Sequence, residues 1–348
     1  MDKPRGRKSE IRRLQLTGGS TYIVSLPKRW VKEHGLVAKD QIRVEWRPSG
    51  NLRIIPETSM ISRRREVELT FHEIPPGLII DHLIAAYLSG ASIIRIRSKS
   101  GFDSKDRKLL RRFISLGRGI EIVNETEKMI EIESLVNAGS LPIYSSLNRM
   151  YLLVRTALKD VFEAVSTGDI SYIEDIEERE NEVDALRLLI ERQIGQVLES
   201  AYLEDSAGLS RWEASALGNI VRTFERMGDH VYTLGQLVVN RNDQTNVDVN
   251  ALPFSLIPSW LMALKQLNSN IKKPNLSEVH EAKLQLTHDM ATLSEFEDAM
   301  WKQSDTVNAI YMNRSSESIR RLCAYASDMA EIVLNIHVHK NSNIVVFE

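Results

Sequence analysis

The sequence has little of what several classes of protein require. It contains one cysteine in 348 residues, so no disulfide can form within the chain and a disulfide-stabilised secreted fold is excluded. No apolar run reaches the roughly 18 residues that a membrane-spanning helix needs. The N-terminus, MDKPRGRKSEIRR, lacks the apolar core of a signal peptide. These absences predict a cytoplasmic protein, and the lone Cys323, in a helical pattern, is predicted to be a small buried residue.

Motifs for nucleotide binding and catalysis are also missing. The stretch LTGGSTYIVSLPKRW, Leu16 to Trp30, has two glycines and several hydroxyl side chains. A phosphate-cradling loop, however, requires Gly-x-x-x-x-Gly-Lys-Ser/Thr between a strand and a helix. The chain contains no such pattern, no Gly-rich cofactor loop, and no Ser/His/Asp or Cys/His arrangement typical of a nucleophile. The protein is therefore predicted not to be an enzyme.

Charge is divided unevenly along the chain. Residues 1–65 contain 16 Lys and Arg against 6 Asp and Glu, a net charge of +10, whereas residues 66–348 contain 29 against 41, a net charge of −12. Such asymmetry is typical of a module for a polyanion joined to an acidic body. The alternative is that the basic segment contacts an acidic partner, including the rest of its own chain.

The first 141 residues contain the strand signals. Residues 11–17, 21–26, 41–46 and 52–55 are predicted to be short strands, and residues 27–34 a short helix. Gly18 and Gly19 permit a tight turn with positive φ. Over residues 66–141 strands alternate with helices at 75–90 and 103–117, the second capped by Asp103. This pattern predicts a small α/β unit without site residues, whose expected role is spacing or dimer contact.

Beyond Pro142 the apolar spacing is helical. Helices are predicted over 147–167, 171–200, 210–240, 258–272, 277–303 and 315–338. The polar linker RNDQTNVDVN separates the first three helices from the last three, which suggests an internal duplication. The predicted fold is multidomain and mainly α. Its predicted domains are a β domain at 1–60, a small α/β domain at 61–141, and two tandem three-helix bundles at 142–241 and 253–340.

Two of the predicted helices carry paired acids. Glu180 with Asp184, and Glu225 with Asp229, have the spacing Glu-x-x-x-Asp, which occurs nowhere else in the chain. Residues four apart share a helix face, and the heptad phase places Glu180 at or near the bundle interior, where a bare carboxylate is costly. A divalent cation between facing helices would offset that cost, and Gly228 is expected to leave space beside the acids. The alternative is that the acids are solvated or paired with nearby arginines: Arg179, Arg187, Arg222 and Arg226.

These helices resemble a known family. The segments ERENEVDALRLLIERQI and NIVRTFERMGDHVYTLGQL look like the second and third helices of a PhoU domain, the phosphate-uptake regulator family, whose hallmark is Glu/Asp-x-x-x-Asp on both helices. That family's fold is a pair of repeated three-helix bundles. The resemblance implies a divalent transition metal (Fe, Zn, Mn or Ni), or a cluster of such ions, as the cofactor, with no bound ion as the alternative. The implied ligands are Glu180, Asp184, Glu225 and Asp229. In the second repeat Ala324 to Asp328 replaces the motif, so no second cluster is expected.

The N-terminal segment resembles another family. LQLTGGSTYIVSLPKRWVKEHGLVAKDQIRVEWRPSGNLRIIP is similar to the SpoVT-AbrB domain in its order of strand, Ser, strand ending in Leu-Pro-Lys, short helix, Gly-Leu, Asp, strand, Gly and strand. Ala38-Lys39-Asp40 stands where Gly-Asp is usual, which is expected only to alter a turn. Members form swapped-hairpin dimers that hold DNA with arginines. The resemblance implies a homodimer on double-stranded DNA, with these expected contacts: Arg5, Arg7, Arg12, Arg13, Ser20, Lys28 and Arg29.

The pairing of the two domains is similar to PhoU-related proteins of archaea. It implies a DNA-binding regulator of phosphate uptake, in which a metal site, a partner protein or both change the geometry of the paired basic domains. A second hypothesis is a scaffold whose helices dock on a phosphate transporter's ATPase or a sensor kinase, with the basic domain serving only to dimerise. A carboxylate-bridged metal oxidase ranks last, because the Glu-x-x-His motif of such bundles is absent.

Overall fold

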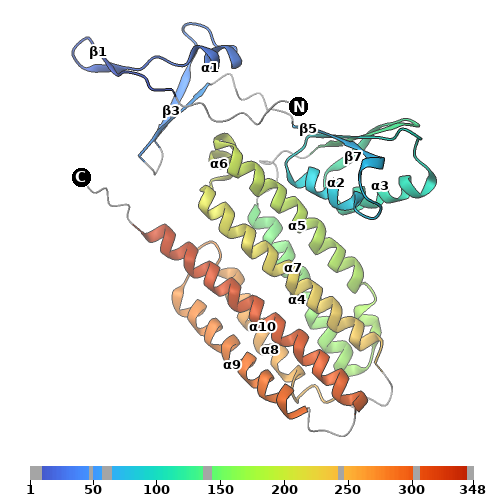
Figure 1. Cartoon of the computed structure of the whole chain (residues 1–348). Helices are drawn as coiled ribbons and strands as arrows, with labels where there is room; N and C mark the ends of the chain where they lie inside the picture. Colours follow the sequence, from blue (N-terminus) through green and yellow to red (C-terminus); the bar gives the residue numbers. More distant parts are fainter. Residues whose placement is uncertain are drawn as a thin grey trace. The chain divides into compact units, whose positions relative to one another are not determined.

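The computed structural model describes residues 10–46, 50–56, 65–135, 143–241, 247–300 and 306–342. The chain divides into two compact units, here called the N-terminal segment, which contains Met1–Arg63, and the body, which contains Arg64–Asn343. As the sequence predicted, the fold is mainly helical, with β hairpins at the N-terminus, then a small α/β domain and then a long helical bundle (Figure 1).

The described residues of the N-terminal segment form two antiparallel strand pairs and one short helix. Its elements are β1 (Gln15–Thr17), β2 (Thr21–Ile23), α1 (Lys28–Glu33), β3 (Ile42–Trp46) and β4 (Leu52–Pro56). β1 pairs with β2 and β3 pairs with β4. Gly18 and Gly19 have φ of +64° and +80°, which confirms the predicted turn. The first two strands are shorter than predicted, because only three residues of each form the ladder.

The α/β domain opens the body. Its elements are β5 (Glu66–Thr70), α2 (Ile79–Leu88), β6 (Ile93–Arg97), α3 (Ser104–Leu116), β7 (Ile120–Glu125) and β8 (Met129–Ser134). The strands are ordered β5-β6-β8-β7, with β5 and β6 parallel and the other pairs antiparallel. Apolar side chains of both helices pack with one face of the sheet. Asp103 caps α3 through a capping box with Asp106, as predicted. α2 begins later than predicted, because Gly77 has φ of +89° and cannot continue a helix.

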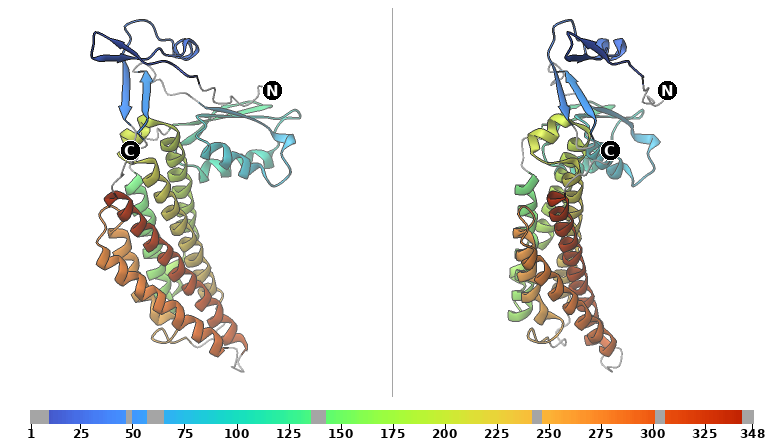
Figure 2. Two further views of the ribbon diagram at one scale, coloured as in Figure 1. Left: turned by 60° about the vertical axis from the view of Figure 1, so that its left-hand side comes forward. Right: turned by 90° about the vertical axis from the view of Figure 1, so that its left-hand side faces the viewer.

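In the part of the chain that the structure describes, six long helices form the bundle (Figure 2). They are α4 (Ile143–Thr167), α5 (Ile176–Glu199), α7 (Arg211–Val239), α8 (Ile257–Ser269), α9 (Leu276–Met300) and α10 (Thr306–Asn341). All six contribute to one continuous apolar core, in which Cys323 is fully buried as predicted. Within the described ranges, no helix combines the length and apolarity that crossing a bilayer would require.

Helix boundaries in the bundle differ from the prediction at several places; α4, for example, begins at Ile143 and not at 147. Residues 170–173 form a 3-10 turn capped by Asp169, so α5 starts at Ile176 and not at 171. A short helix, α6 (Ala201–Ala207), was not predicted; Gly208 ends it in the left-handed conformation. α10 starts at Thr306, nine residues before the predicted 315. Packing extends it through a serine-rich stretch in which Ser315 and Ser316 are fully buried.

Glycines set the spacing of α5 and α7. A Cβ added at Gly228 would lie 3.3 Å from Val183 Cγ1, and one added at Gly235 would lie 2.3 Å from Ile176 Cδ1. Both glycines therefore let the backbone of α7 approach the side chains of α5. Val183 fills most of the space beside Gly228, and only a gap of about 10 Å³ remains there, bordered by Glu180.

A buried arginine joins the α/β domain to the bundle. Arg192 of α5 is 2% exposed and donates from Nη1 to the carbonyl of Tyr87 at 2.5 Å and from Nη2 to that of Ala91 at 2.8 Å. Its guanidinium lies 4.8 Å from the centroid of the Tyr87 ring. Leu188, one turn earlier, is part of the apolar core of the α/β domain. These contacts make the α/β domain and the bundle one compact unit.

Candidate functional site

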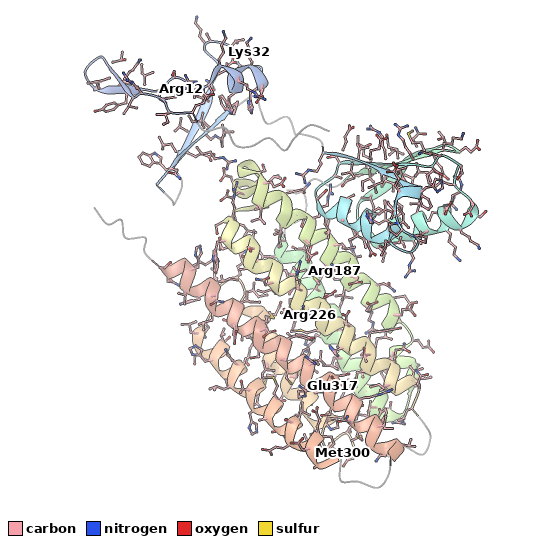
Figure 3. The ribbon with its side chains drawn as sticks, viewed as in Figure 1. Arg12, Lys32, Arg187, Arg226, Met300 and Glu317 are labelled. Carbon is pink, nitrogen blue, oxygen red and sulfur yellow. The ribbon has the colours of Figure 1, made fainter. Side chains whose placement is uncertain are left out.

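The expected DNA contacts of the N-terminal segment all lie on its surface. Arg12 and Arg13 precede β1, Ser20 is in the β1–β2 turn, and Lys28 and Arg29 begin α1; all five are exposed. Figure 3 marks Arg12 in this segment. Arg12 is paired with Glu10, and Arg29 Nε is 2.8 Å from Glu33 Oε1.

Arg13 and Lys28 have no ion-pair partner within the described ranges, so their charges are available to an external anion. The other two expected contacts, Arg5 and Arg7, lie outside the described residues.

The N-terminal segment leaves its apolar side chains uncovered. Of its described residues only Pro56 is buried. Trp46 is 83% exposed, Val37 70% and Tyr22 67%. The exposed large apolar residues among those described are Ile11, Leu14, Leu16, Tyr22, Ile23, Val24, Val37, Ile42, Val44, Trp46 and Leu52. Such a surface is far from that of an independently stable domain, which must bury much of its apolar area.

The departure from the SpoVT-AbrB pattern falls at a conformationally special residue. Lys39 has φ of +82°, in the region that glycine enters most easily. Where the family usually has glycine, this chain places a side chain that costs free energy in that conformation.

The four acids of the paired motifs come together between α5 and α7. The pKa of Glu180 is raised to about 7, first by burial and then by the negative charges of Asp184 and Asp229. The pKa values of Glu225 and Asp229 are also raised, first by burial and then by neighbouring acids of the cluster. We call these four residues the carboxylate cluster. The negative charges of these partly buried carboxylates repel one another.

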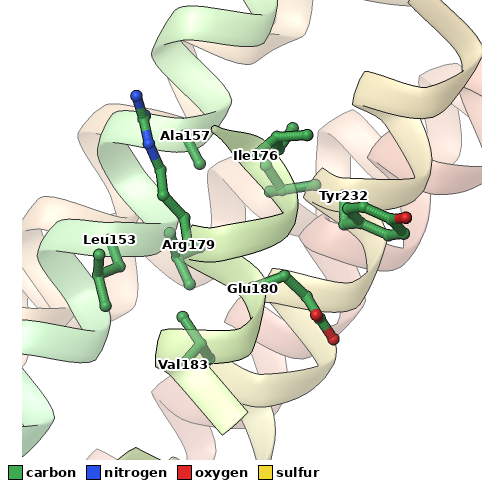
Figure 4. A pocket seen from close by; sticks show the side chains of 10 residues that line it. Leu153, Ala157, Ile176, Arg179, Glu180, Val183 and Tyr232 are labelled. Atoms are coloured by element: carbon green, nitrogen blue, oxygen red, sulfur yellow. The ribbon is translucent and has the colours of Figure 1, made fainter. Parts of the chain in front are cut away.

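Glu180 borders a small apolar gap in the bundle (Figure 4). Leu153, Ile176, Val183 and Gly228 line this gap. The carboxylate of Glu180 points away from Leu153, toward the side on which Tyr232 lies. The gap accommodates about one water-sized sphere, since its volume is about 10 Å³, so it cannot hold a ligand of any size.

Arg187 is the cation within the carboxylate cluster. Its Nε lies 3.5 Å from Asp184 Oδ1 and 3.4 Å from Glu225 Oε1, and its Nη1 lies 3.3 Å from Glu191 Oε2. The same charge opposes the rise in the pKa of Glu225 and of Asp229. The alternative that the acids are paired with arginine thus holds in part, through Arg187.

Of the other three arginines named from the sequence, Arg226 also acts on the cluster, because its charge opposes the rise in the pKa of Glu225 and of Asp229. None of the three is ion-paired with a member of the cluster in the described residues. Arg179 pairs with Asp160 and Asp175. Arg222 pairs with Glu191, and the guanidinium of Arg226 lies over the ring of Tyr325, 5.6 Å from its centroid. Sequence spacing could have identified Arg187 as the arginine that faces the acids. It lies seven residues, or two helical turns, after Glu180, so both side chains share one helix face.

The donor chemistry of the carboxylate cluster suits a divalent cation, since hard and borderline ions accept carboxylate oxygens. As the side chains stand, however, no three His, Cys, Asp or Glu residues in the described ranges are arranged around a common point for an ion. A bound ion would compete with Arg187 for Asp184 and Glu225. Binding would therefore require a local rearrangement of these side chains.

Cations of both repeats act on Asp328, at the place where the second repeat lacks the motif. Asp328 of α10 has a pKa raised by burial and by Glu331, and lowered by Arg226 and Lys283. Lys283 Nζ lies 2.8 Å from Glu331 Oε1. Where the second repeat lacks the Glu-x-x-x-Asp motif, the negative charges of Asp328 and Glu331 are thus partly neutralised by Arg226 and Lys283.

The fold and the clustered acids define a mainly helical protein. In the chain, a strand-rich basic segment precedes the two helices that carry the carboxylate motif. Residues 147–238 match the PhoU domain, and residues 15–62 match the antidote-toxin recognition protein MazE, a bacterial antitoxin. Over these two ranges the chain is thus similar to a PhoU domain and to a MazE/AbrB-like domain, the two resemblances drawn from the sequence.

Solved PhoU structures are among the matches to this fold. The phosphate transport system regulatory protein PhoU from Streptococcus pneumoniae is 15% identical, with a TM-score of 0.43, over 58% of this chain and 96% of that one. PhoU from Pseudomonas aeruginosa is 13% identical, with a TM-score of 0.41, over 57% of this chain and 96% of that one. No curated protein matches the sequence.

Proposed function

We propose that the protein is a DNA-binding regulator of phosphate uptake that acts as a homodimer through its N-terminal segment. One observation carries the proposal: among its described residues, the MazE/AbrB-like segment has both cations without an ion-pair partner and apolar strands that the protein leaves exposed. This segment is joined to a PhoU-like domain. The proposed activity is binding, and it involves no catalytic step.

The uncovered apolar surface supports the dimer. Among the described residues of this segment only Pro56 is buried. The segment gains a core if the same surface of a second copy covers Tyr22, Val44 and Trp46. In a dimer the net charge of +10 in residues 1–65 would also be doubled, which favours association with a polyanion.

The cations divide into two groups for DNA binding. Arg13 and Lys28 can contact phosphates at once, whereas Arg12 and Arg29 must exchange Glu10 and Glu33 for phosphate. We therefore expect the double variant Arg13→Ala/Lys28→Ala to lose more DNA affinity than Arg12→Ala/Arg29→Ala.

The test is duplex-DNA binding by the full chain over a salt series. Each lost phosphate contact should reduce the salt slope by about 1. A control variant, Lys159→Gln/Lys265→Gln, removes two exposed charges from the bundle and should leave the slope unchanged. Wild-type protein that fails to bind any duplex would exclude the proposal.

A metal is the second part of the proposal. Glu180, Asp184, Glu225 and Asp229 would hold a divalent transition ion, whose positive charge would offset their mutual repulsion. Occupancy of this site, or docking of a partner protein, would then alter the DNA affinity of the dimer. DNA affinity that is identical with added Mn²⁺ or Zn²⁺, with chelator and with phosphate would contradict this coupling.

The scaffold remains the alternative, supported by the PhoU domain alone. In that case the bundle docks on a phosphate transporter's ATPase or a sensor kinase, and the N-terminal segment only dimerises. The variant Arg12→Ala/Arg13→Ala/Lys28→Ala/Arg29→Ala separates the two functions. A scaffold predicts unchanged capture of those partners and no DNA-related defect.

A further inference from the structure

The solvent-facing side of α3 carries only cations and serines. Leu110 and Phe113 of this helix are fully buried against the sheet. Successive residues turn by about 100° around a helix, so the opposite side presents six exposed residues, here called the α3 face. They are Ser104, Lys105, Lys108, Arg111, Arg112 and Ser115.

The charges of the α3 face are not balanced by the protein. Among the residues that the structure describes, none of its four cations has an ion-pair partner. Other cations of the α/β domain do: Arg107, on the same helix, pairs with Glu125, and Arg95, on the open face of the sheet, pairs with Glu66 and Glu131. The α/β domain thus neutralises Arg95 and Arg107 with its own acids, whereas the four cations of the α3 face keep an unneutralised positive charge in the described ranges.

We propose that the α3 face is a second contact for the phosphate backbone of double-stranded DNA. Lys105 and Arg112 are separated by about 10 Å along the helix axis. A duplex carries one charge per roughly 1.7 Å, so about six phosphate charges lie within that length. Guanidinium groups bind phosphate through two parallel hydrogen bonds, and serine hydroxyls also donate to phosphate oxygens. This inference rests on the proposed function, because it takes DNA as the polyanion that the chain binds.

The composition of the α3 face favours nucleic acid over other acidic partners. A helix that lies on a membrane buries a row of apolar side chains in the lipid, and protein interfaces depend on buried aromatic or apolar anchors. The α3 face has neither. Contacts to a DNA backbone need only cations and hydroxyl groups.

The experiment compares three full-length proteins in binding to one long duplex over a salt series. The first is the wild type, and the second carries Lys105→Gln, Lys108→Gln, Arg111→Gln and Arg112→Gln, which preserve helix propensity. The third is a matched control that neutralises four exposed cations of the bundle: Lys159→Gln, Lys265→Gln, Lys273→Gln and Arg314→Gln. Equal thermal unfolding of all three establishes that the folds are intact.

In the α3 variant, we expect the salt slope to fall in magnitude by about 3 to 4, with at least a roughly tenfold weaker affinity at low salt, while the control keeps the wild-type slope. An α3 variant that binds with the wild-type slope overturns this inference and leaves the proposed function standing. A wild-type protein that does not bind DNA overturns both. An α3 variant that loses only its binding to anionic phospholipid vesicles, with DNA binding unchanged, assigns the face to membranes and also overturns the inference.

Discussion

Replacing Arg187 by methionine tests the electrostatics of the carboxylate cluster directly. Methionine keeps most of the side-chain length and apolar contact but removes the charge. Arg187 has oxygens of three carboxylates at 3.3 to 3.5 Å. At such distances one pair gains about 5 kcal/mol of Coulomb energy with an effective dielectric constant of about 20.

Most of that Coulomb energy is offset by desolvation and solvent screening. The side chain of Arg187 is 21% exposed, and those of Glu225 and Asp184 are 24% and 32% exposed. Exposed pairs contribute below about 1 kcal/mol each, and breaking a buried pair costs about 3 to 5 kcal/mol. For this partly buried site we expect Arg187→Met to lower the free energy of unfolding by about 2 kcal/mol near pH 8 in chelator.

Urea denaturation followed by circular dichroism measures this loss. Arg187→Lys, which keeps the charge, should lose clearly less. The double variant Arg187→Met/Glu180→Gln should recover part of the stability, because removing one acid relieves the repulsion that Arg187 had balanced.

Mn²⁺ or Zn²⁺ should stabilise Arg187→Met more than the wild type, because the competing cation is gone. If Arg187→Met unfolds like the wild type, with and without these ions, then neither the pairing nor the competition assigned to Arg187 is correct.

Three further predictions concern single positions. The pKa of Glu180 is about 7 in the folded protein against an ordinary 4.5, so its ionisation destabilises the fold as pH rises through this window. In chelator, Glu180→Gln should equal the wild type at pH 4.5 and be more stable by about 1 to 2 kcal/mol at pH 8 after allowance for solvent screening; an equal difference at both pH values would contradict this. Gly235→Ala places a Cβ 2.3 Å from Ile176 Cδ1 and should destabilise the bundle by about 1 kcal/mol in urea denaturation, since overpacking exceeds the gain in helix propensity; adding Ile176→Val should restore the loss, and failure to do so would rule out that contact as the cause. Lys39→Gly relieves the positive φ and should slow amide exchange around this turn, corresponding to about 1 kcal/mol; faster exchange would argue against strain there.

Local patterns determined much of this protein. Helical spacing of apolar residues predicted the six long helices, and single residues such as Asp103 marked where a helix begins, because capping involves hydrogen bonds over three or four residues. The acids of each Glu-x-x-x-Asp pair share a face because the helix repeat alone puts them there. Boundaries failed in both directions: α10 begins at Thr306, before its predicted start, whereas the 3-10 turn at residues 170–173 delays α5 to Ile176.

Only the tertiary structure decided how these helices meet. The sequence could not give the close approach of α5 and α7 at Gly235, the placement of Arg187 between Asp184 and Glu225, or the joining of the α/β domain to the bundle by Arg192. Arg192 binds carbonyl groups more than 100 residues away in the chain. Periodicity and capping act over a few residues, whereas such contacts depend on how distant surfaces fit together. The physical reason is that local sequence patterns reflect interactions between residues close in the chain, whereas these contacts join residues far apart in it.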